Sequence, residues 1–205
     1  MNVKGLQRLI KEGLPVMRNT FLFRAISEIP AGHMYAYGDE ERWAMRGFDD
    51  RQTINDSPYD LKEARALAFS RKQLAEVFAV INNELAERNV SPFNRLFFVC
   101  EVFTDNDVAF SGIVQKDRYD MVIDLQDANR PSRKDWTPDF SYQIPILEGE
   151  KLRFSDLAGK PHREEIIRIS QDMLCLPEGA YADFVKVKDG CFFYHDLVIR
   201  SLQKS

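Results

Sequence analysis

Three short apolar segments separated by polar turns constrain the fold more than any other feature of this sequence. Residues 96–103, 109–114 and 120–125 have the length of strands, and the stretches that connect them, 104–107 and 116–118, are short and polar. Connections of this length join antiparallel neighbours, because a parallel pair needs a crossover of about a dozen residues or more. The pattern therefore predicts an antiparallel meander.

Helical patterns lie on both sides of this meander. Near the N-terminus, four apolar residues recur at helical spacing: Leu6, Leu9, Ile10 and Leu14. Gly13 is a natural end for that helix. Further helices are predicted over residues 61–88, with an interruption near Ser70, and over residues 164–174. The inward stripe of the long helix consists of Leu74, Val77, Phe78, Ile81 and Leu85.

The remaining apolar segments predict more strands. They are expected at residues 20–26, 42–46 and 142–146, and the last thirty residues have the pattern of a hairpin. Helices that flank a mainly antiparallel sheet define an α+β fold class. The 205 residues suit a single domain over residues 1–205, or two small lobes with a hinge near residues 101–104.

Composition and charge exclude several classes of protein. Apolar residues make up 44% of the chain and charged residues 29%, so a core can form and disorder is excluded. The net charge of −4 argues against a general nucleic-acid binder. One basic loop with a single aromatic is nevertheless a candidate contact for an anionic substrate or a nucleic acid strand: Arg130, Arg133, Lys134 and Trp136.

Targeting signals and metal-ligand spacings are not found in the sequence. No segment has the length and apolarity of a membrane span or of a signal peptide, so we expect a cytoplasmic protein without a membrane partner. Cys100, Cys175 and Cys191 lie far apart, each among apolar residues, and no spacing typical of zinc ligands occurs. We therefore expect them to be buried free thiols in a reducing compartment.

Four short motifs follow one another along the chain in a fixed order. Lys4 opens the first amphipathic segment, which ends in Gly-Leu-Pro-Val at residues 13–16, and a strand at residues 43–46 ends in Arg46. The aromatic strand of the meander is followed by Ser-Gly-Ile at residues 111–113, which the motif predicts to be a turn. An acidic strand at residues 182–185 and an aromatic strand at residues 192–195 close the chain. In this order the motifs resemble the nucleotide-binding domain of phosphoenolpyruvate synthase and pyruvate phosphate dikinase, which has an ATP-grasp fold.

The resemblance implies sites for ATP and Mg²⁺ in a minimal, divergent domain that stands alone. Lys4 and Arg46 take the positions of cations that bind the phosphates, and Asp49 and Asp50 fall near an acidic pair of the family. An ordinary pairing of Arg46 with one of these two carboxylates is the alternative.

The other implied contacts concern adenine and the metal. Glu101 and Phe103 lie on the strand whose backbone holds adenine in the family. Asp183 takes the position of a metal-binding glutamate, and His195 that of a glutamine at the metal–phosphate site. Lys4, Arg46, Asp183 and His195 are therefore expected to converge on one cleft.

Two departures from the family pattern concern the end of the chain. Histidine stands where the family has glutamine, and Leu197 stands where the family has a second arginine. The compensating groups that the sequence offers are Asp124, Asp196 and Arg200. Because imidazole is a poor ligand for Mg²⁺, the departures predict weak dependence on this ion.

Two functions follow as expectations. The first is an ATP- and Mg²⁺-dependent phosphotransferase or ligase that acts on an unknown second substrate. The alternative is a non-catalytic relative, a pseudoenzyme that serves as a nucleotide- or protein-binding module, and the departures favour binding over turnover.

Overall fold

The computed structural model describes residues 3–34, 40, 42–53, 63–103, 105–127 and 137–200, so the basic loop around Arg130 and Trp136 lies outside the described residues. The chain divides into two compact units. The N-terminal unit contains Lys4 and Val16–Thr104, and the C-terminal unit contains Gly5–Pro15 and the chain from residue 105 onward. The boundary follows directly on the expected hinge at residues 101–104, and the description as one domain stays a prediction.

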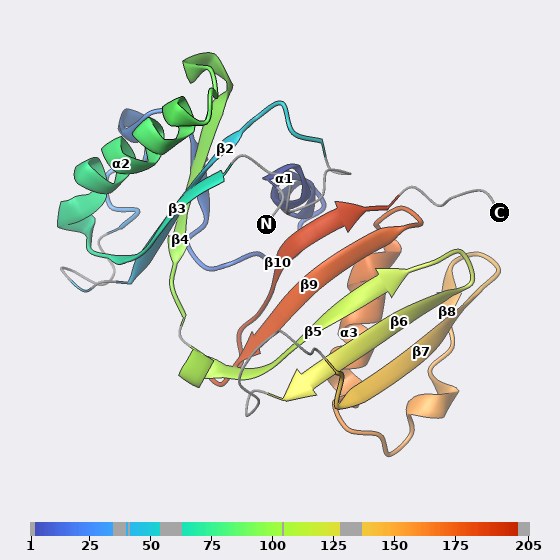
Figure 1. Ribbon diagram of the computed structural model, residues 1–205. Coiled ribbons are helices and arrows are strands. Elements are labelled where there is room, and N and C mark those ends of the chain that lie inside the picture. The colour runs from blue at the N-terminus through green and yellow to red at the C-terminus, as the bar shows by residue number, and fades with distance from the viewer. Residues whose placement is uncertain are drawn as a thin grey trace. The chain divides into compact units, whose positions relative to one another are not determined.

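The N-terminal unit is an antiparallel sheet with the strand order β1-β4-β2-β3 and a helix on one face (Figure 1). Its elements are β1 (Phe21–Phe23), β2 (Trp43–Asp49), β3 (Glu63–Phe69), α2 (Leu74–Glu87) and β4 (Arg95–Glu101). Short 3-10 turns precede β2, α2 and β4: Ile26–Glu28, Arg71–Gln73 and Pro92–Asn94.

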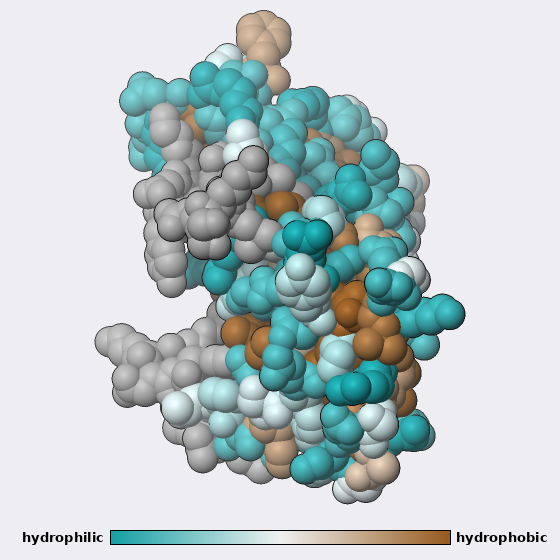
Figure 2. All heavy atoms as spheres, turned by 90° about the vertical axis from the view of Figure 1, so that its right-hand side faces the viewer, coloured by the Kyte–Doolittle hydropathy of each residue, from teal (hydrophilic) through white to brown (hydrophobic). Residues whose placement is uncertain are grey.

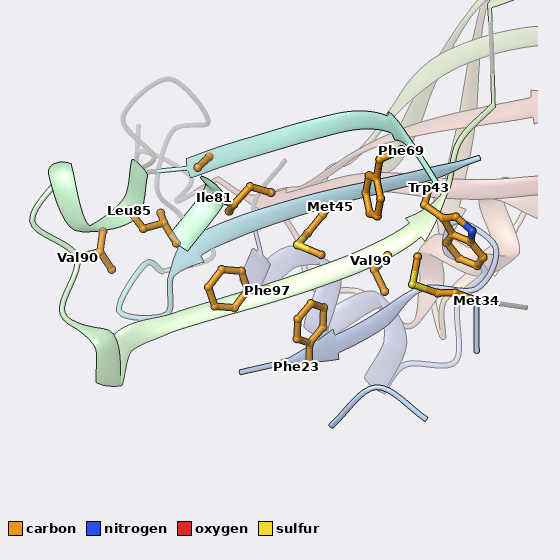
Figure 3. Packing of buried hydrophobic residues seen from close by; sticks show 11 residues of the cluster. Phe23, Met34, Trp43, Met45, Phe69, Ile81, Leu85, Val90, Phe97 and Val99 are labelled. Carbon is orange, nitrogen blue, oxygen red and sulfur yellow. The ribbon is translucent and has the colours of Figure 1, made fainter. Parts of the chain in front are cut away.

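The core of this unit lies between the sheet and α2 (Figure 3). Strand residues Met45, Phe97 and Val99 pack there with Ile81 and Leu85 of the helix, and all five are buried. On the same face, a Cβ atom at Gly47 would come within 2.7 Å of Ile81 and 2.8 Å of Leu85. The glycine therefore lets α2 pack directly on the backbone of β2.

The helix predicted over residues 61–88 is wrong in its first half. Residues 63–69 form β3, an edge strand that pairs with β2, and the helix begins only at Leu74. Ala64 is buried toward the core while Arg65 is exposed, which is the alternation of a strand. The predicted interruption near Ser70 is confirmed, because Ser70 forms a capping box with Gln73 ahead of the helix.

The C-terminal unit is a larger antiparallel sheet with the order β10-β9-β5-β6-β7-β8 (Figure 1). Its strands are β5 (Val108–Lys116), β6 (Asp120–Asp127), β7 (Phe140–Leu147), β8 (Lys151–Leu152), β9 (Ala180–Val187) and β10 (Phe192–Ile199). Helix α3 (Arg163–Leu174) packs on one face, where it buries Phe184 and Tyr194. The predicted meander is wrong in its first half: residues 96–103 contribute β4 to the four-stranded sheet, between β1 and β2, because the connection that follows leads from one unit into the other. Its second half is confirmed, since β5 and β6 are antiparallel neighbours. The final hairpin and the α+β class are confirmed.

Helix α1 (Val3–Lys11) confirms the first helical pattern, with one correction. Gly13 ends it in a left-handed conformation, with φ of 72°. Leu6 and Leu9 are fully buried, but Ile10, which the pattern placed inward, is 42% exposed. A Cβ atom on Gly5 would lie 2.0 Å from the carbonyl oxygen of Leu197, so α1 packs against the backbone of β10.

The turn predicted at Ser111 and Gly112 is wrong. Ser111 and Gly112 lie in the middle of β5 and not in a turn, and a Cβ atom at Gly112 would collide with Phe184.

No helix in the described ranges is long and apolar enough to cross a membrane. The view in Figure 2 is mostly hydrophilic, with smaller apolar areas. The large apolar side chains that are exposed are Ile10, Leu67, Val80, Phe93, Tyr119 and Leu147.

Candidate functional site

Lys4 is held by a carboxylate at the end of β2. Its Nζ lies 2.5 Å from Oδ1 of Asp50, and the other oxygen of Asp50 accepts a hydrogen bond from Arg24. Burial tends to raise the pKa of Asp50, but the hydrogen bonds and charges of the two cations outweigh it and lower the pKa below its ordinary value. Two cations therefore share one ionised carboxylate.

Arg46 projects from β2 on the face of the sheet that does not carry α2. Its neighbours Met45 and Gly47 face the helix, so the alternation of the strand turns Arg46 the other way. Its cross-strand partners are Phe98 on β4 and Arg65 on β3. The nearby carboxylate Asp49 binds Arg51 through two hydrogen bonds, of 2.6 and 2.9 Å.

A buried thiol lies close to Arg46 on this face. Cys100 is 2% exposed, and burial raises its pKa to about 12, although the positive charge of Arg46 acts in the opposite direction. The thiol is therefore neutral at physiological pH, and it packs against the sulfur of Met17 at 3.8 Å. All three cysteines are free, as expected, but only Cys100 is buried: Cys175 is exposed and Cys191 is partly exposed, so the expected burial is wrong for these two.

The segment predicted to hold adenine already uses two of its backbone donors. The N–H of Glu101 donates to the carbonyl of Arg18 at 3.0 Å, and the N–H of Val102 donates to the carbonyl of Arg42 at 2.8 Å. A hydrogen bond from this segment to adenine would have to come from other groups. The assignment of Glu101 and Phe103 to an adenine site stays a prediction.

In the C-terminal unit, the structure brings acidic side chains into one row across the sheet. Asp183 on β9 is paired directly with Asp196 on β10 and, on its other side, with Ile113 on β5. Asp124 on β6 pairs with Ile113 and so belongs to the same row. The row lies on the face opposite α3, because the adjacent Phe184 packs toward the helix.

The charges of these carboxylates also affect the pKa of Tyr181, a neighbouring residue on β9. Burial raises the pKa of this phenol first of all. The negative charges of Asp183, Asp196 and Asp124 raise it further, and the positive charge of Arg200 opposes them. All four charges therefore lie within electrostatic range of one tyrosine on the same sheet face.

His195 is the additional residue of a β-bulge. The register runs from Tyr194 opposite Phe184 to Asp196 opposite Asp183, so His195 has no cross-strand partner position of its own. The residue aligned with Asp183 is consequently Asp196. The sequence named Asp196 only as a compensating group, since a bulge leaves no signal in the composition of the strand.

The donor set of this pair suits a hard cation. Mg²⁺ takes oxygen ligands, commonly one or two carboxylates together with phosphate oxygens and water. Asp183 and Asp196 provide two carboxylates at adjacent positions. Within the described ranges, no group of three or more histidine, cysteine or acidic side chains could hold a metal ion by itself. The pair thus fits an ion that arrives with a ligand, rather than one caged by protein.

The predicted site residues fall into two groups. Lys4, Arg46, Glu101 and Phe103 belong to the N-terminal unit. Asp183 and His195 belong to the C-terminal unit. The expected convergence on one cleft stays a prediction.

Solved structures resemble this arrangement over nearly the whole chain. The biotin carboxylase domain of 2-oxoglutarate carboxylase from Hydrogenobacter thermophilus, solved with MgADP and bicarbonate, superimposes with a TM-score of 0.53 at 11% identity and 97% coverage of this chain. The chain has the ATP-grasp fold. D-alanyl-alanine synthetase A from Vibrio cholerae matches with a TM-score of 0.49 at 12% identity, again over 97% of this chain.

The chain corresponds to only part of each of these proteins. This chain spans 54% of the synthetase and 39% of the biotin carboxylase domain. No family model matches the sequence. No curated protein matches it either. The likeness therefore establishes the ATP-grasp fold and leaves the reaction to be proposed.

Proposed function

We propose that the protein binds ATP as its magnesium complex and transfers a phosphoryl group, as a phosphotransferase or ligase with a second substrate. The observation that carries this proposal is the alignment of Asp183 with Asp196 on the sheet of an ATP-grasp fold. Directly opposed carboxylates repel one another, and a divalent cation relieves that repulsion. When bound, the cation would neutralise charge on the phosphates during transfer.

The side chains of this protein would bind the metal and the phosphates. Asp183 and Asp196 would hold the metal, while Lys4 and Arg46 would supply positive charge to the phosphates. Asp50 holds the ammonium of Lys4 at 2.5 Å, so the side chain has a defined position and loses less conformational entropy on binding a phosphate. The motif order favours the phosphoenolpyruvate synthase type among ATP-grasp proteins, and we include that type in the proposal.

Binding of MgATP without turnover is the second candidate. It is favoured by the departures from the family pattern on β10, where His195 and Leu197 stand in place of a glutamine and an arginine. The same pattern would suit a module that senses nucleotide or binds a protein partner. The two candidates share the nucleotide site and differ only in the chemical step.

Calorimetric titration with ATP, with and without Mg²⁺, tests the shared site. We expect binding that requires the cation, and Asp183→Asn should weaken it about tenfold or more, because a charge-assisted contact contributes about 1.5–3 kcal/mol. Asp156→Asn is the matched control, since Asp156 lies in an exposed turn of the same unit. Equal affinity in the wild type and Asp183→Asn would contradict the proposal.

The same titration with Lys4→Gln tests the contribution of the N-terminal unit. We expect a loss of about tenfold or more for this variant. Lys11→Gln, at an exposed position of the same helix, should bind as the wild type does. Release of labelled phosphate from ATP then separates an enzyme from a binding module.

A further inference from the structure

An arginine and a tyrosine form a fixed pair on the acidic face of the six-stranded sheet. The guanidinium carbon of Arg200 lies 4.1 Å from the centre of the Tyr181 ring. Such a contact is attractive, because the face of an aromatic ring carries partial negative charge. Tyr181 thereby gives the long arginine side chain a defined position.

The backbone of Arg200 is fixed as well. Its N–H donates to the carbonyl of Gly179 at 2.9 Å, immediately after β10 ends. A Cβ atom on Gly179 would lie 2.2 Å from the carbonyl oxygen of Arg200, and Gly179 has a φ of 82°. Only glycine combines this conformation with so close an approach, so the pair of residues anchors the strand end that presents the arginine.

Arg200 lies two residues beyond Val198, which is the cross-strand partner of Tyr181. The bulge at His195 places Asp196 and then Val198 on the face opposite α3, with Val198 paired to Tyr181. Leu197 is fully buried on the other face. The next residue on the acidic face is Arg200, so a cation follows the carboxylates along β10.

Arg200 and the proposed metal ligands lie at different positions along the strands of the sheet. Tyr181 and Asp183 are two residues apart on β9, which corresponds to about 6.8 Å at the rise of an antiparallel strand. In the described part of the chain, the guanidinium of Arg200 forms no ion pair with a carboxylate. A guanidinium presents its donors in a planar fork that matches carboxylate and phosphate oxygens.

From this geometry we infer that Arg200, positioned by Tyr181, binds an oxyanion of the second substrate beside the nucleotide. The inference rests on the proposed nucleotide site, because that site gives the oxyanion its function. The shared chemistry is that of a carboxylate or a phosphate group. Arg200 would determine specificity for such a substrate, and Tyr181 is a positioning residue.

The test uses the full chain and two simple anions, acetate and inorganic phosphate. Each is titrated while the Nε–H signals of the arginines are followed by NMR, first alone and then with a non-hydrolysable MgATP analogue present. Comparison with Arg200→Gln assigns the signal of Arg200. The matched control is Arg118→Gln, because Arg118 also lies over a tyrosine ring, at 5.3 Å from that of Tyr119.

We expect one of the two anions to shift the Arg200 signal, with and without the nucleotide analogue. Arg200→Gln should weaken that binding about tenfold, while Arg118→Gln leaves it unchanged. Tyr181→Phe should retain the affinity, since the ring remains, and Tyr181→Leu should lose it. A response to acetate identifies a carboxylate substrate, and a response to phosphate alone identifies a phosphorylated one.

Three results would overturn the inference. They are the absence of any shift of the Arg200 signal, equal anion affinity in Arg200→Gln, and displacement of the anion by the MgATP analogue, which would assign Arg200 to the nucleotide. In each case the titration of MgATP against Asp183→Asn still reports on the proposed function by itself. Failure of the nucleotide site would abolish that titration while leaving anion binding to Arg200 measurable.

Discussion

Asp183 and Asp196 are direct cross-strand partners on β9 and β10. Paired carboxylates on one face cost stability, and the cost disappears when one charge is removed or when a cation binds. We therefore predict that Asp196→Asn raises the free energy of unfolding by about 0.2–1 kcal/mol without divalent cations. Urea denaturation with and without Mg²⁺ measures this effect.

The same experiment carries its own control. Asp156→Asn removes a charge from an exposed turn of the same unit and should leave the free energy of unfolding within about 0.5 kcal/mol of the wild type. A loss of stability in Asp196→Asn without Mg²⁺ would show that the two carboxylates do not repel one another.

A second prediction concerns pH and the contact between Lys4 and Asp50. The pKa of Asp50 is lowered in the folded protein, so its ionised form stabilises the fold above the unfolded-state pKa, about 3.9. That contribution should be lost as the pH falls through the lowered folded-state pKa. The difference in free energy of unfolding between wild type and Asp50→Asn, measured from pH 7 downward, should shrink only in this acidic range.

A difference that shrank between pH 5 and 7 would contradict the assigned direction of the Asp50 pKa. Asp117→Asn provides a control, because Asp117 contacts only the amide of Gln115 among the hydrogen bonds of its side chain that the structure describes. This variant removes one carboxylate and leaves the contact between Lys4 and Asp50 in place.

The third prediction concerns Lys116, a buried lysine at the end of β5 whose side chain reaches the C-terminal end of α3. Its Nζ donates to the carbonyls of Leu174 at 2.9 Å and Leu176 at 2.7 Å, where a helix has carbonyls without helical partners. Lys116→Met keeps the apolar stem and removes the donor, so we expect a loss of about 1.5–3 kcal/mol in the free energy of unfolding.

Lys188→Met is the matched control for this loss. Lys188 also donates to a backbone carbonyl, that of Asn106 at 2.7 Å, but at an exposed position. Its replacement should change the free energy of unfolding by no more than about 0.5 kcal/mol. Equal losses of unfolding free energy in Lys116→Met and Lys188→Met, measured by thermal or urea unfolding, would show that the burial of Lys116 does not increase the contribution of its hydrogen bonds.

The fourth prediction concerns the packing of α2 on β2. Gly47→Ala adds a methyl group where Ile81 and Leu85 already approach within 2.8 Å or less, so we expect a loss of about 1–3 kcal/mol. Combining it with Ile81→Ala should give a smaller loss than the sum of the two single changes, because the contact is then relieved. Strict additivity in urea denaturation would show that the helix moves away freely.

Some elements were predictable because their signals are local. The hairpin of β5 and β6, Gly13 at the end of α1 and the final hairpin depend on neighbouring residues, and all are confirmed. The pairing expected between residues 96–103 and 109–114 is wrong, because a short polar connection does not reveal that β4 and β5 belong to different sheets. Residues 63–69 were mispredicted for the opposite reason. Glu-Ala-Arg-Ala-Leu-Ala-Phe favours a helix by intrinsic propensity, but pairing with β2 and burial of Ala64 determine a strand.

The residues of the candidate site were likewise predictable only where their signals are local. The sequence motifs predict Lys4 and Asp183 as site residues, but they contain no information on which side chains lie opposite each other. Asp50, the partner of Lys4, lies 46 residues away from it in the sequence. Tyr181 gives no signal in the sequence, because an isolated tyrosine in a strand is usually a packing residue. Such partnerships depend on sheet register, which long-range packing sets.

The bulge at His195 has a consequence for comparing this chain with others. Because His195 is the extra residue, its deletion would leave Tyr194 toward the helix and Asp196 toward the opposite face. Position 195 is therefore where β10 can shorten without exchanging its inner and outer side chains. In a homologue with an uninterrupted strand, the residue equivalent to Asp196 would occupy the place that motif comparison assigns to His195, and the apparent exchange of glutamine for histidine would reduce to an inserted residue.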